Sequence, residues 1–247
     1  MKKASIALFI LASLFVLSAC GQSIAKPSLS EASAADSKNN VTSGMVDSVL
    51  VNPIVVYEET LADLTANQGG NIGTGSEQRE ITKEGVEFHA GEGENPFLPF
   101  AKGLNEAADV KDGNQAFCIR FKPSAKDFGF MLSATNKLGI TIGEDSAPLV
   151  FSIEHEYMAP MEGTIKIEPE NWYRALIAIN PDGEMSGVIW KDNEESTNAY
   201  FYLDNSQFHD ENDKNQSWQI LIGFLGEATF TISDYQYYTF SDIVRAG

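Results

Sequence analysis

Residue types that cross-link chains or ligate metals are scarce in this sequence. It has 2 cysteines and 3 histidines among 247 residues. The histidines lie far apart and lack the spacing of a zinc site; they are His89, His155 and His209. Cys118 lies inside an apolar run, where a thiol usually packs as an inert core residue. Because Cys20 is assigned a different role below, we expect no intrachain disulfide.

Basic residues are also few. The chain has 17 Lys and Arg against 35 Asp and Glu, which gives a net charge of −18. Removal of residues 1–19, which contain two Lys and no acids, leaves a net charge of −20. A strongly acidic surface repels nucleic acid and anionic lipid. We therefore expect no nucleic-acid partner, whereas divalent cations and neutral or basic partners are compatible with this charge.

Long apolar runs are confined to the N-terminus. Lys2 and Lys3 precede an apolar stretch from Ile6 to Leu17, which at about a dozen residues is too short for a comfortable membrane span. The stretch ends in LSACG, residues 17–21. These residues resemble the lipobox of bacterial lipoproteins, in which small residues precede a Cys that is diacylated and becomes the mature N-terminus. The alternative is an ordinary secretory peptide with a chance Cys20.

The lipobox resemblance implies a location as well as a modification. Residues 1–19 would be a signal peptide, and Cys20 would carry the lipid. One acyl chain holds a protein only marginally, whereas two anchor it stably. We therefore expect a lipid-anchored protein of the bacterial cell envelope, outside the cytoplasmic membrane, with the membrane as a partner through Cys20.

The region after Cys20 lacks the composition of a folded core. Residues 20–44 are rich in Ser, Ala and Asn and show no apolar periodicity, which predicts a disordered linker. Such a chain spans roughly 25–30 Å and would act as a spacer. Residues 45–247, at about 200 residues, are enough for one domain with a substantial core.

The central feature of that domain is a predicted β-hairpin. Two apolar runs, Trp172–Ile179 and Met185–Trp190, flank the sequence NPDG at residues 180–183. Pro fixes φ at the second turn position, and Gly accepts a positive φ at the fourth. Both arms carry apolar residues on both faces, which is typical of strands between two layers. The hairpin should therefore lie in the middle of a layered β-structure.

The remaining strands recur at short intervals. Apart from a helical turn at Thr60–Ala66, we expect strands at Pro53–Glu58, Gly85–Ala90, Asn114–Lys122, Asp127–Ala134, Leu138–Ile142, Pro148–Glu154, Gly163–Ile167, Ala199–Leu203, Ser217–Leu225 and Glu227–Ser233. A spacing of about 10–12 residues with turn signals between predicts an all-β, two-sheet antiparallel sandwich or jelly roll.

Three segments carry a family resemblance within residues 115–240. They are QAFCIRFKPS, NWYRALIAINPDGEMSGVIW and SWQILIGFLGEATFTISDYQYY. This pattern resembles the concanavalin A-like lectin and glucanase superfamily, as in laminin-G-type and pentraxin-type domains. The resemblance implies two curved antiparallel sheets with a sugar site on the concave face. It does not imply an activity, because the fold carries enzymes, lectins and structural modules alike.

Catalytic carboxylates of the glucanase type are incomplete. Glucanases of this superfamily carry three alternating acids on one strand, the outer two acting as nucleophile and acid/base. Glu211 and Asp213 have this alternation but lack the third acid, and 154–156 and 168–170 lack the middle Asp. We therefore expect no enzymatic activity.

A calcium site and a sugar site remain candidates. Lectin-like jelly rolls often hold one structural calcium, and Glu58 with Asp234 could supply its oxygens. In Asn198–Asp204, alternation places Ala199, Phe201 and Leu203 on one face and Tyr200 with Tyr202 on the other, flanked by Asn198 and Asp204. Aromatic rings beside amides and carboxylates suit sugar stacking and hydrogen bonding.

A second aromatic group and the tryptophans are expected to serve packing. Tyr235, Tyr237 and Tyr238 form another polar-aromatic cluster, for which sheet packing is the commoner role. Trp172 and Trp190 are expected in the core. The sequence therefore favours a tethered, non-catalytic, lectin-like domain that binds extracellular carbohydrate. The alternatives are a glucanase-type glycoside hydrolase and a module for protein interaction or envelope structure.

Overall fold

The computed structural model of the chain describes residues 44–67, 79–90, 97–99, 114–124, 129–134, 138–142, 144–152, 157–204, 220–225 and 228–245. Residues Thr42–Gly247 form one compact unit. The predicted signal peptide, Cys20 and most of the linker lie outside the described residues, so these domain boundaries stay predictions. Among the described residues, none of the helices is long and apolar enough to cross a membrane.

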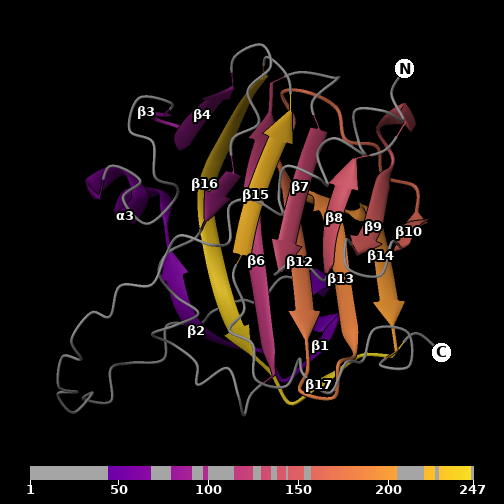
Figure 1. Cartoon of the computed structure of the whole chain (residues 1–247). Helices are drawn as coiled ribbons and strands as arrows, with labels where there is room; N and C mark the ends of the chain where they lie inside the picture. Colours follow the sequence, from indigo (N-terminus) through magenta and orange to yellow (C-terminus); the bar gives the residue numbers. More distant parts are fainter. Residues whose placement is uncertain are drawn as a thin grey trace, which may run out of the picture. The chain divides into compact units, whose positions relative to one another are not determined.

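The larger of two layers is a nine-stranded antiparallel sheet (Figure 1). Eight strands follow one another in the order β11 (Glu162–Gly163), β14 (Glu194–Leu203), β13 (Met185–Lys191), β12 (Tyr173–Ile179), β6 (Gln115–Pro123), β16 (Ala228–Thr239), β4 (Val86–Ala90) and β3 (Arg79–Ile81). The ninth, β2 (Ile54–Glu59), pairs with the C-terminal half of β16, whose N-terminal half pairs with β4.

The smaller layer is a six-stranded antiparallel sheet that lies over the larger one in Figure 1. Its order is β10 (Tyr157–Pro160), β9 (Pro148–Ser152), β8 (Leu138–Ile142), β7 (Gly129–Ala134), β15 (Ile220–Leu225) and β5 (Phe97–Pro99). Short elements complete the described chain: α2 (Gly44–Asp47), β1 (Leu50–Val51), α3 (Leu61–Ala66), the 3₁₀ turn η2 (Glu144–Ser146) and β17 (Asp242–Ile243). The predicted fold class, a two-sheet antiparallel sandwich, is confirmed.

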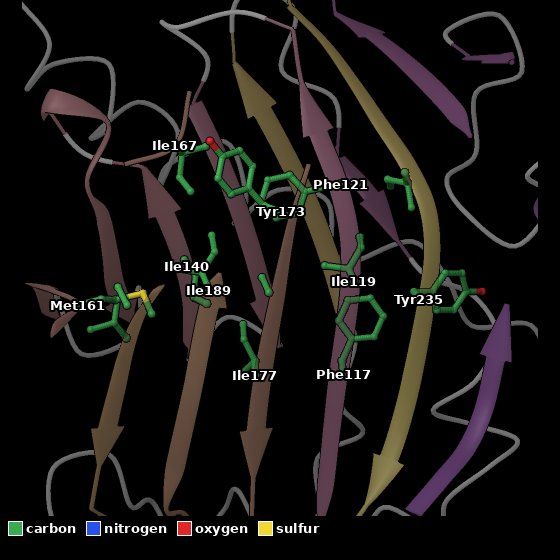
Figure 2. Close-up of a cluster of buried hydrophobic side chains, with 14 of the residues drawn as sticks. Phe117, Ile119, Phe121, Ile140, Met161, Ile167, Tyr173, Ile177, Ile189 and Tyr235 are labelled. Carbon is green, nitrogen blue, oxygen red and sulfur yellow. The ribbon is translucent and has the colours of Figure 1, made fainter. Parts of the chain in front are cut away.

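The main core fills the space between the two sheets. Ile140 of the small sheet lies in one buried cluster with Ile119, Ile177 and Ile189 of the large sheet (Figure 2). Phe121 and Phe230, on neighbouring strands, stack with ring centroids 5.1 Å apart. Burying each such side chain contributes about 1.5–3 kcal/mol, which explains why alternation points these residues inward.

The predicted central hairpin is confirmed, and its turn follows the expected chemistry. β12 and β13 pair from Tyr173 opposite Lys191 to Ile179 opposite Met185. Gly183 adopts a φ of 86° and donates its N–H to the Asn180 carbonyl at 3.0 Å. The hairpin is buried on both faces, as its two-faced apolar pattern predicts, because a second core covers the other side of the sheet.

That second core is built by the two ends of the folded unit. We call residues 44–51 and 240–245 the terminal strap; in it β1 pairs with β17, and Figure 1 labels the two near each other at the lower end of the large sheet. The strap covers one buried cluster on the face away from the small sheet. The strap contributes Val46, Val49, Leu50, Phe240 and Ile243 to this cluster. They pack over residues of the large sheet, namely Ala116, Cys118, Leu176, Ala178, Val188, Trp190 and Tyr238.

Three strand predictions need correction. The strand expected at Ala199–Leu203 already begins at Glu194. Gly163–Ile167 was expected to be one strand, but only Glu162–Gly163 pair, because Thr164 and Ile165 both direct their N–H groups to the Asn198 carbonyl and the strand ladder stops there. The last long strand does not end at Ser233 but runs to Thr239. It continues because a register shift at Ser233 keeps Tyr235 and Tyr237 directed into the main core.

Candidate functional site

Polar side chains gather on the face of the large sheet that points away from the small sheet, which we call the outer face. Strand register places one row across this face, from Asn198 through Trp190, Arg174 and Arg120 to Asp234. The row lies beside the terminal strap, which reaches it where Met45 contacts Asn198. Five strands therefore bring together residues that are far apart in the sequence.

Four charged residues at this row form one network, which we call the charged cluster: Arg120, Arg174, Asp192 and Asp234. Arg120 donates from Nε and Nη2 to Asp192 Oδ2, both at 2.8 Å. Arg174 donates from Nε to Asp192 Oδ1 at 3.2 Å and from Nη1 to Asp234 Oδ1 at 2.8 Å. The four side chains are between 12% and 25% exposed, so the cluster is desolvated in part but reachable from solvent.

A β-bulge is the reason that Asp234 belongs to this cluster. Ile232 lies opposite Phe121, and Asp234 lies opposite Arg120, so Ser233 is an extra residue without a partner on β6. Without the bulge, period 2 would place Asp234 on the same face as Ile232, inside the main core. Ser233 Oγ donates to Asp234 Oδ2 at 2.7 Å and accepts from Arg120 Nη1 at 3.0 Å.

Trp172 extends the cluster with an aromatic ring. The Arg120 guanidinium carbon lies 4.1 Å from the ring centroid, and Lys122 Nζ lies 5.5 Å from it. Both distances are in the range of cation–π attraction. The expectation that Trp172 belongs to the core is wrong, because it is half-buried, whereas Trp190 is buried as expected. Trp172 precedes β12, where one ring face can reach the charged side chains.

The electrostatics of the cluster follow from burial and pairing. Burial alone would lower the pKa of Arg174, but the charges of Asp234 and Asp192 outweigh it and the pKa is raised. Arg174 is therefore a permanent cation. Beneath it, burial raises the pKa of Cys118 to about 12, so the thiol stays protonated and is the inert core residue that the sequence indicated.

The predicted sugar-stacking strand lies at the edge of the same face. Ala199, Phe201 and Leu203 are buried in the main core, as expected, and Tyr200 is 41% exposed on the outer face. A hydrogen bond to Glu162 on the neighbouring strand raises the pKa of the Tyr200 hydroxyl. Asp204 is exposed at the end of the strand.

Tyr202 differs from Tyr200 in its burial and in its partner: it is half-buried, and its hydroxyl bonds to a residue beside the hairpin turn. It donates to Glu184 Oε1 at 2.7 Å. Glu184 also accepts from Asn180 Nδ2 at 2.7 Å and from both Nε and Nη2 of Arg245, at 3.0 and 3.1 Å. These donors, with Arg245 first, lower the pKa of Glu184. Tyr202 therefore helps to hold the C-terminal part of the strap.

The side chain of Asn198, the other polar residue expected beside the tyrosines, is also bonded within the chain: its Nδ2 donates to the Glu195 carbonyl at 2.7 Å.

The two residues named as calcium ligands both lie on the outer face. Glu58 lies opposite Gln236 and accepts from its Nε2 at 2.6 Å, while Asp234 belongs to the charged cluster. Within the part of the chain that the structure describes, no group of three or more His, Cys, Asp or Glu could hold a metal ion. Structural calcium at Glu58 and Asp234 stays a prediction.

Other sequence candidates divide between packing and undescribed regions. Tyr235, Tyr237 and Tyr238 are buried, which fits the packing role expected for them. The acidic groups 154–156 and 211–213 lie outside the described residues. Glu168 and Glu170 are exposed beside a buried end of the hairpin, without a middle acid.

Comparison with known proteins adds the fold. No model of a protein family matches the sequence, and no curated protein matches it. Among solved structures, the PL-14 alginate lyase of Aplysia kurodai superposes with a TM-score of 0.54 at 8% identity, covering 75% of this chain and 99% of that one. The carbohydrate recognition domain of Emp46p gives 0.52 at 12% identity, covering 76% and 98%.

The fold is a two-sheet antiparallel jelly roll. At 8% and 12% identity the likeness concerns the arrangement of strands, and it agrees with the antiparallel two-sheet topology described above. One neighbour is named as a lyase and the other as a recognition domain, so this jelly-roll architecture alone does not select between catalysis and binding.

Proposed function

We propose that this protein is a lipid-anchored envelope protein whose jelly-roll domain binds carbohydrate without transforming it. The observation that carries the proposal is the charged cluster beside Trp172 on the outer face. Saccharide sites combine a ring surface with a few fixed hydrogen-bonding groups. Arg120, Arg174, Asp192 and Asp234 supply donors and acceptors that neighbouring side chains already hold in position.

The geometry of the carboxylates supports binding over hydrolysis. A retaining glycosidase needs one carboxylate as nucleophile and one protonated acid. In the charged cluster, Asp192 accepts hydrogen bonds at both oxygens from Arg120 and Arg174. Asp234 accepts at both oxygens from Arg174 and Ser233. Carboxylates held in this way suit a recognition role.

A glycan array on the full chain tests the proposal. We expect at least one saccharide to bind, and Trp172→Ala to lower its affinity by about tenfold or more, in line with the loss of one aromatic contact and its neighbouring hydrogen bonds. Tyr200→Ala is the matched variant at the edge of the same face. A loss confined to Tyr200→Ala would place the site on β14 instead, and a chain that binds no saccharide would contradict the proposal.

The absence of catalysis is tested on the same saccharides. Each ligand is incubated with the full chain, and its products are separated by size and assayed for new reducing ends or unsaturated ends. We expect the ligand to be recovered intact. If the full chain releases shorter products and Asp234→Asn does not, the proposal that the domain binds carbohydrate without transforming it is wrong.

The membrane attachment has its own test. The sequence LSACG at residues 17–21 predicts lipid on Cys20. We expect Cys20→Ser to leave the protein unprocessed or to release it from the membrane fraction. Ala19→Ser, which keeps a small residue before the Cys, serves as control. A Cys20→Ser protein that fractionates and migrates like the unaltered chain would rule out the lipid anchor.

A further inference from the structure

We infer that the charged cluster selects an uncharged saccharide, which it recognises through neighbouring hydroxyl groups, and that it discriminates against both uronates and amino sugars. This inference rests on the proposed function, and it adds the chemical class of the ligand. It follows from how the four charges compensate one another, from the donors and acceptors that they leave available, and from the charge of the whole chain.

The cluster has no surplus charge of either sign. Arg174 lies between Asp192 and Asp234, and Arg120 pairs with Asp192. The cation next to them, Lys122, is itself paired with Glu84 at 2.6 Å and lies 3.8 Å from Glu170. Two guanidiniums and two carboxylates therefore balance, and the nearest lysine adds no net positive charge.

A hydroxyl group is the ligand that uses both kinds of partner. It donates one hydrogen bond and accepts others. A guanidinium has five N–H groups, and the cluster engages three of Arg120 and two of Arg174 with Asp192, Asp234 and Ser233. Each carboxylate oxygen has two lone pairs, and Asp192 Oδ1 and both oxygens of Asp234 each accept one hydrogen bond within the cluster. Adjacent sugar hydroxyls can thus accept from an arginine and donate to an aspartate at the same time.

A charged sugar of either sign meets side chains of like charge in the cluster. A uronate carboxylate would accept from Arg120 or Arg174 but would approach Asp192 and Asp234, in a chain of net charge −18. An ammonium group would reverse the problem, because each aspartate that it could bind is already paired with an arginine. Like-charge contacts at a partly desolvated site cost more than they do in water.

The test compares three hexasaccharides of matched length on the full chain, purified in a detergent without a sugar headgroup. The probes are a neutral glucan, an oligogalacturonate and an oligoglucosamine, each titrated calorimetrically. We expect the neutral probe to bind at least about tenfold more tightly than either charged probe. Its affinity should also change less than about twofold when sodium chloride is raised tenfold, because an uncharged ligand has no ionic attraction to screen.

Two variants test the inference through the ratio of affinities for charged and neutral probes, and not only through a loss of affinity. Asp234→Asn leaves Arg174 under-compensated, so we expect the ratio of uronate to neutral affinity to rise by about tenfold. Arg174→Gln should shift the ratio toward the amino sugar. Lys166→Gln, an exposed residue away from the cluster, should leave all three affinities unchanged. Thermal melts accompany each variant.

The possible results separate the inference from the proposed function. A stronger uronate or glucosamine complex in the unaltered chain would overturn the inference while carbohydrate binding stands. Equal losses for all three probes in Asp234→Asn and Arg174→Gln would also overturn it, because a merely structural role predicts no change in the ratios. If no hexasaccharide and no array saccharide binds, it is the proposed function that fails.

Discussion

At the scale of single residues, the β14 strand shows how alternation divides packing from surface. Phe201 is buried in the main core, and its backbone carbonyl accepts from Ser186 Oγ at 2.9 Å. Opposite it, Gly187 has no room for a side chain, because a Cβ there would lie 2.6 Å from both the Leu176 carbonyl and the Phe201 ring. Tyr200, one position before Phe201, stands exposed on the outer face.

The two neighbours should therefore respond differently to truncation. We expect Phe201→Ala to cost about 3–5 kcal/mol of unfolding free energy, because it opens a cavity in the main core. Tyr200→Ala should leave the domain folded, and it should lower the affinity for any saccharide that reaches the edge of the sheet. Thermal or urea melts of both variants, with glycan titrations, measure this. Melting of the domain by Tyr200→Ala would show that the ring holds layers together.

At the scale of elements, the C-terminal end of the terminal strap makes an ionic contact beside the turn of the central hairpin. Glu184, beside that turn, binds Arg245 through two hydrogen bonds, and the Tyr202 hydroxyl joins them. The β1–β17 pairing itself covers only two residue pairs. Apolar burial of Val46, Leu50 and Ile243 holds the rest of the strap, so the contact at Glu184 should decide how often the C-terminal end opens.

The strap should loosen in acid. The pKa of Glu184 is lowered in the folded chain, so its contribution is complete above the ordinary value of 4.5 and is lost as pH falls through the lowered value. We expect amide protection at residues 242–245 to fall over that range. Glu184→Gln should show low protection at every pH.

A local readout is needed because other acids titrate over the same range. Asp63 in helix α3 gives an internal control, because its pKa is also lowered, in this case by its hydrogen bonds to Thr60. If protection of residues 242–245 in the unaltered chain stays flat as pH falls from neutral to well below 4.5, the ionic contact does not hold the strap.

At the scale of the whole molecule, one large sheet lies between two cores of unequal size. The main core separates the two sheets, and the strap core covers the middle of the outer face. A central hairpin buried on both sides needs both covers, which explains why its arms are apolar throughout. The strap also leaves the charged cluster beside it as the polar part of that face.

The folded unit should be self-sufficient. We expect a chain that begins at Met45 to fold alone, with less than about 10% helix by far-UV circular dichroism, because its described helices are short and its strands are many. A matched chain that begins at Val51 removes α2 and Leu50 from the strap core and should melt at a lower temperature. A strongly helical spectrum, or an unfolded chain from Met45, would contradict this prediction.

The candidate site was only partly visible in the sequence. The outward position of Tyr200 follows from period 2, and the structure bears it out. The sequence suggests Asp234 as a calcium ligand, yet Asp234 lies against Arg174, because local sequence does not show which residues meet across strands. Trp172 begins an apolar run, which predicts a core position, but its place before β12, beside Arg120, leaves it half-buried.

Local chemistry in the sequence determined the strands, the NPDG turn and the two-faced hairpin, because alternation and turn residues act over a few positions. The tertiary structure decided which residues meet on the outer face. The register with β6 makes Ser233 an extra residue and turns Asp234 outward. The two segments of the terminal strap cover the apolar middle of the sheet. These outcomes depend on burial between segments more than a hundred residues apart, which no local pattern encodes.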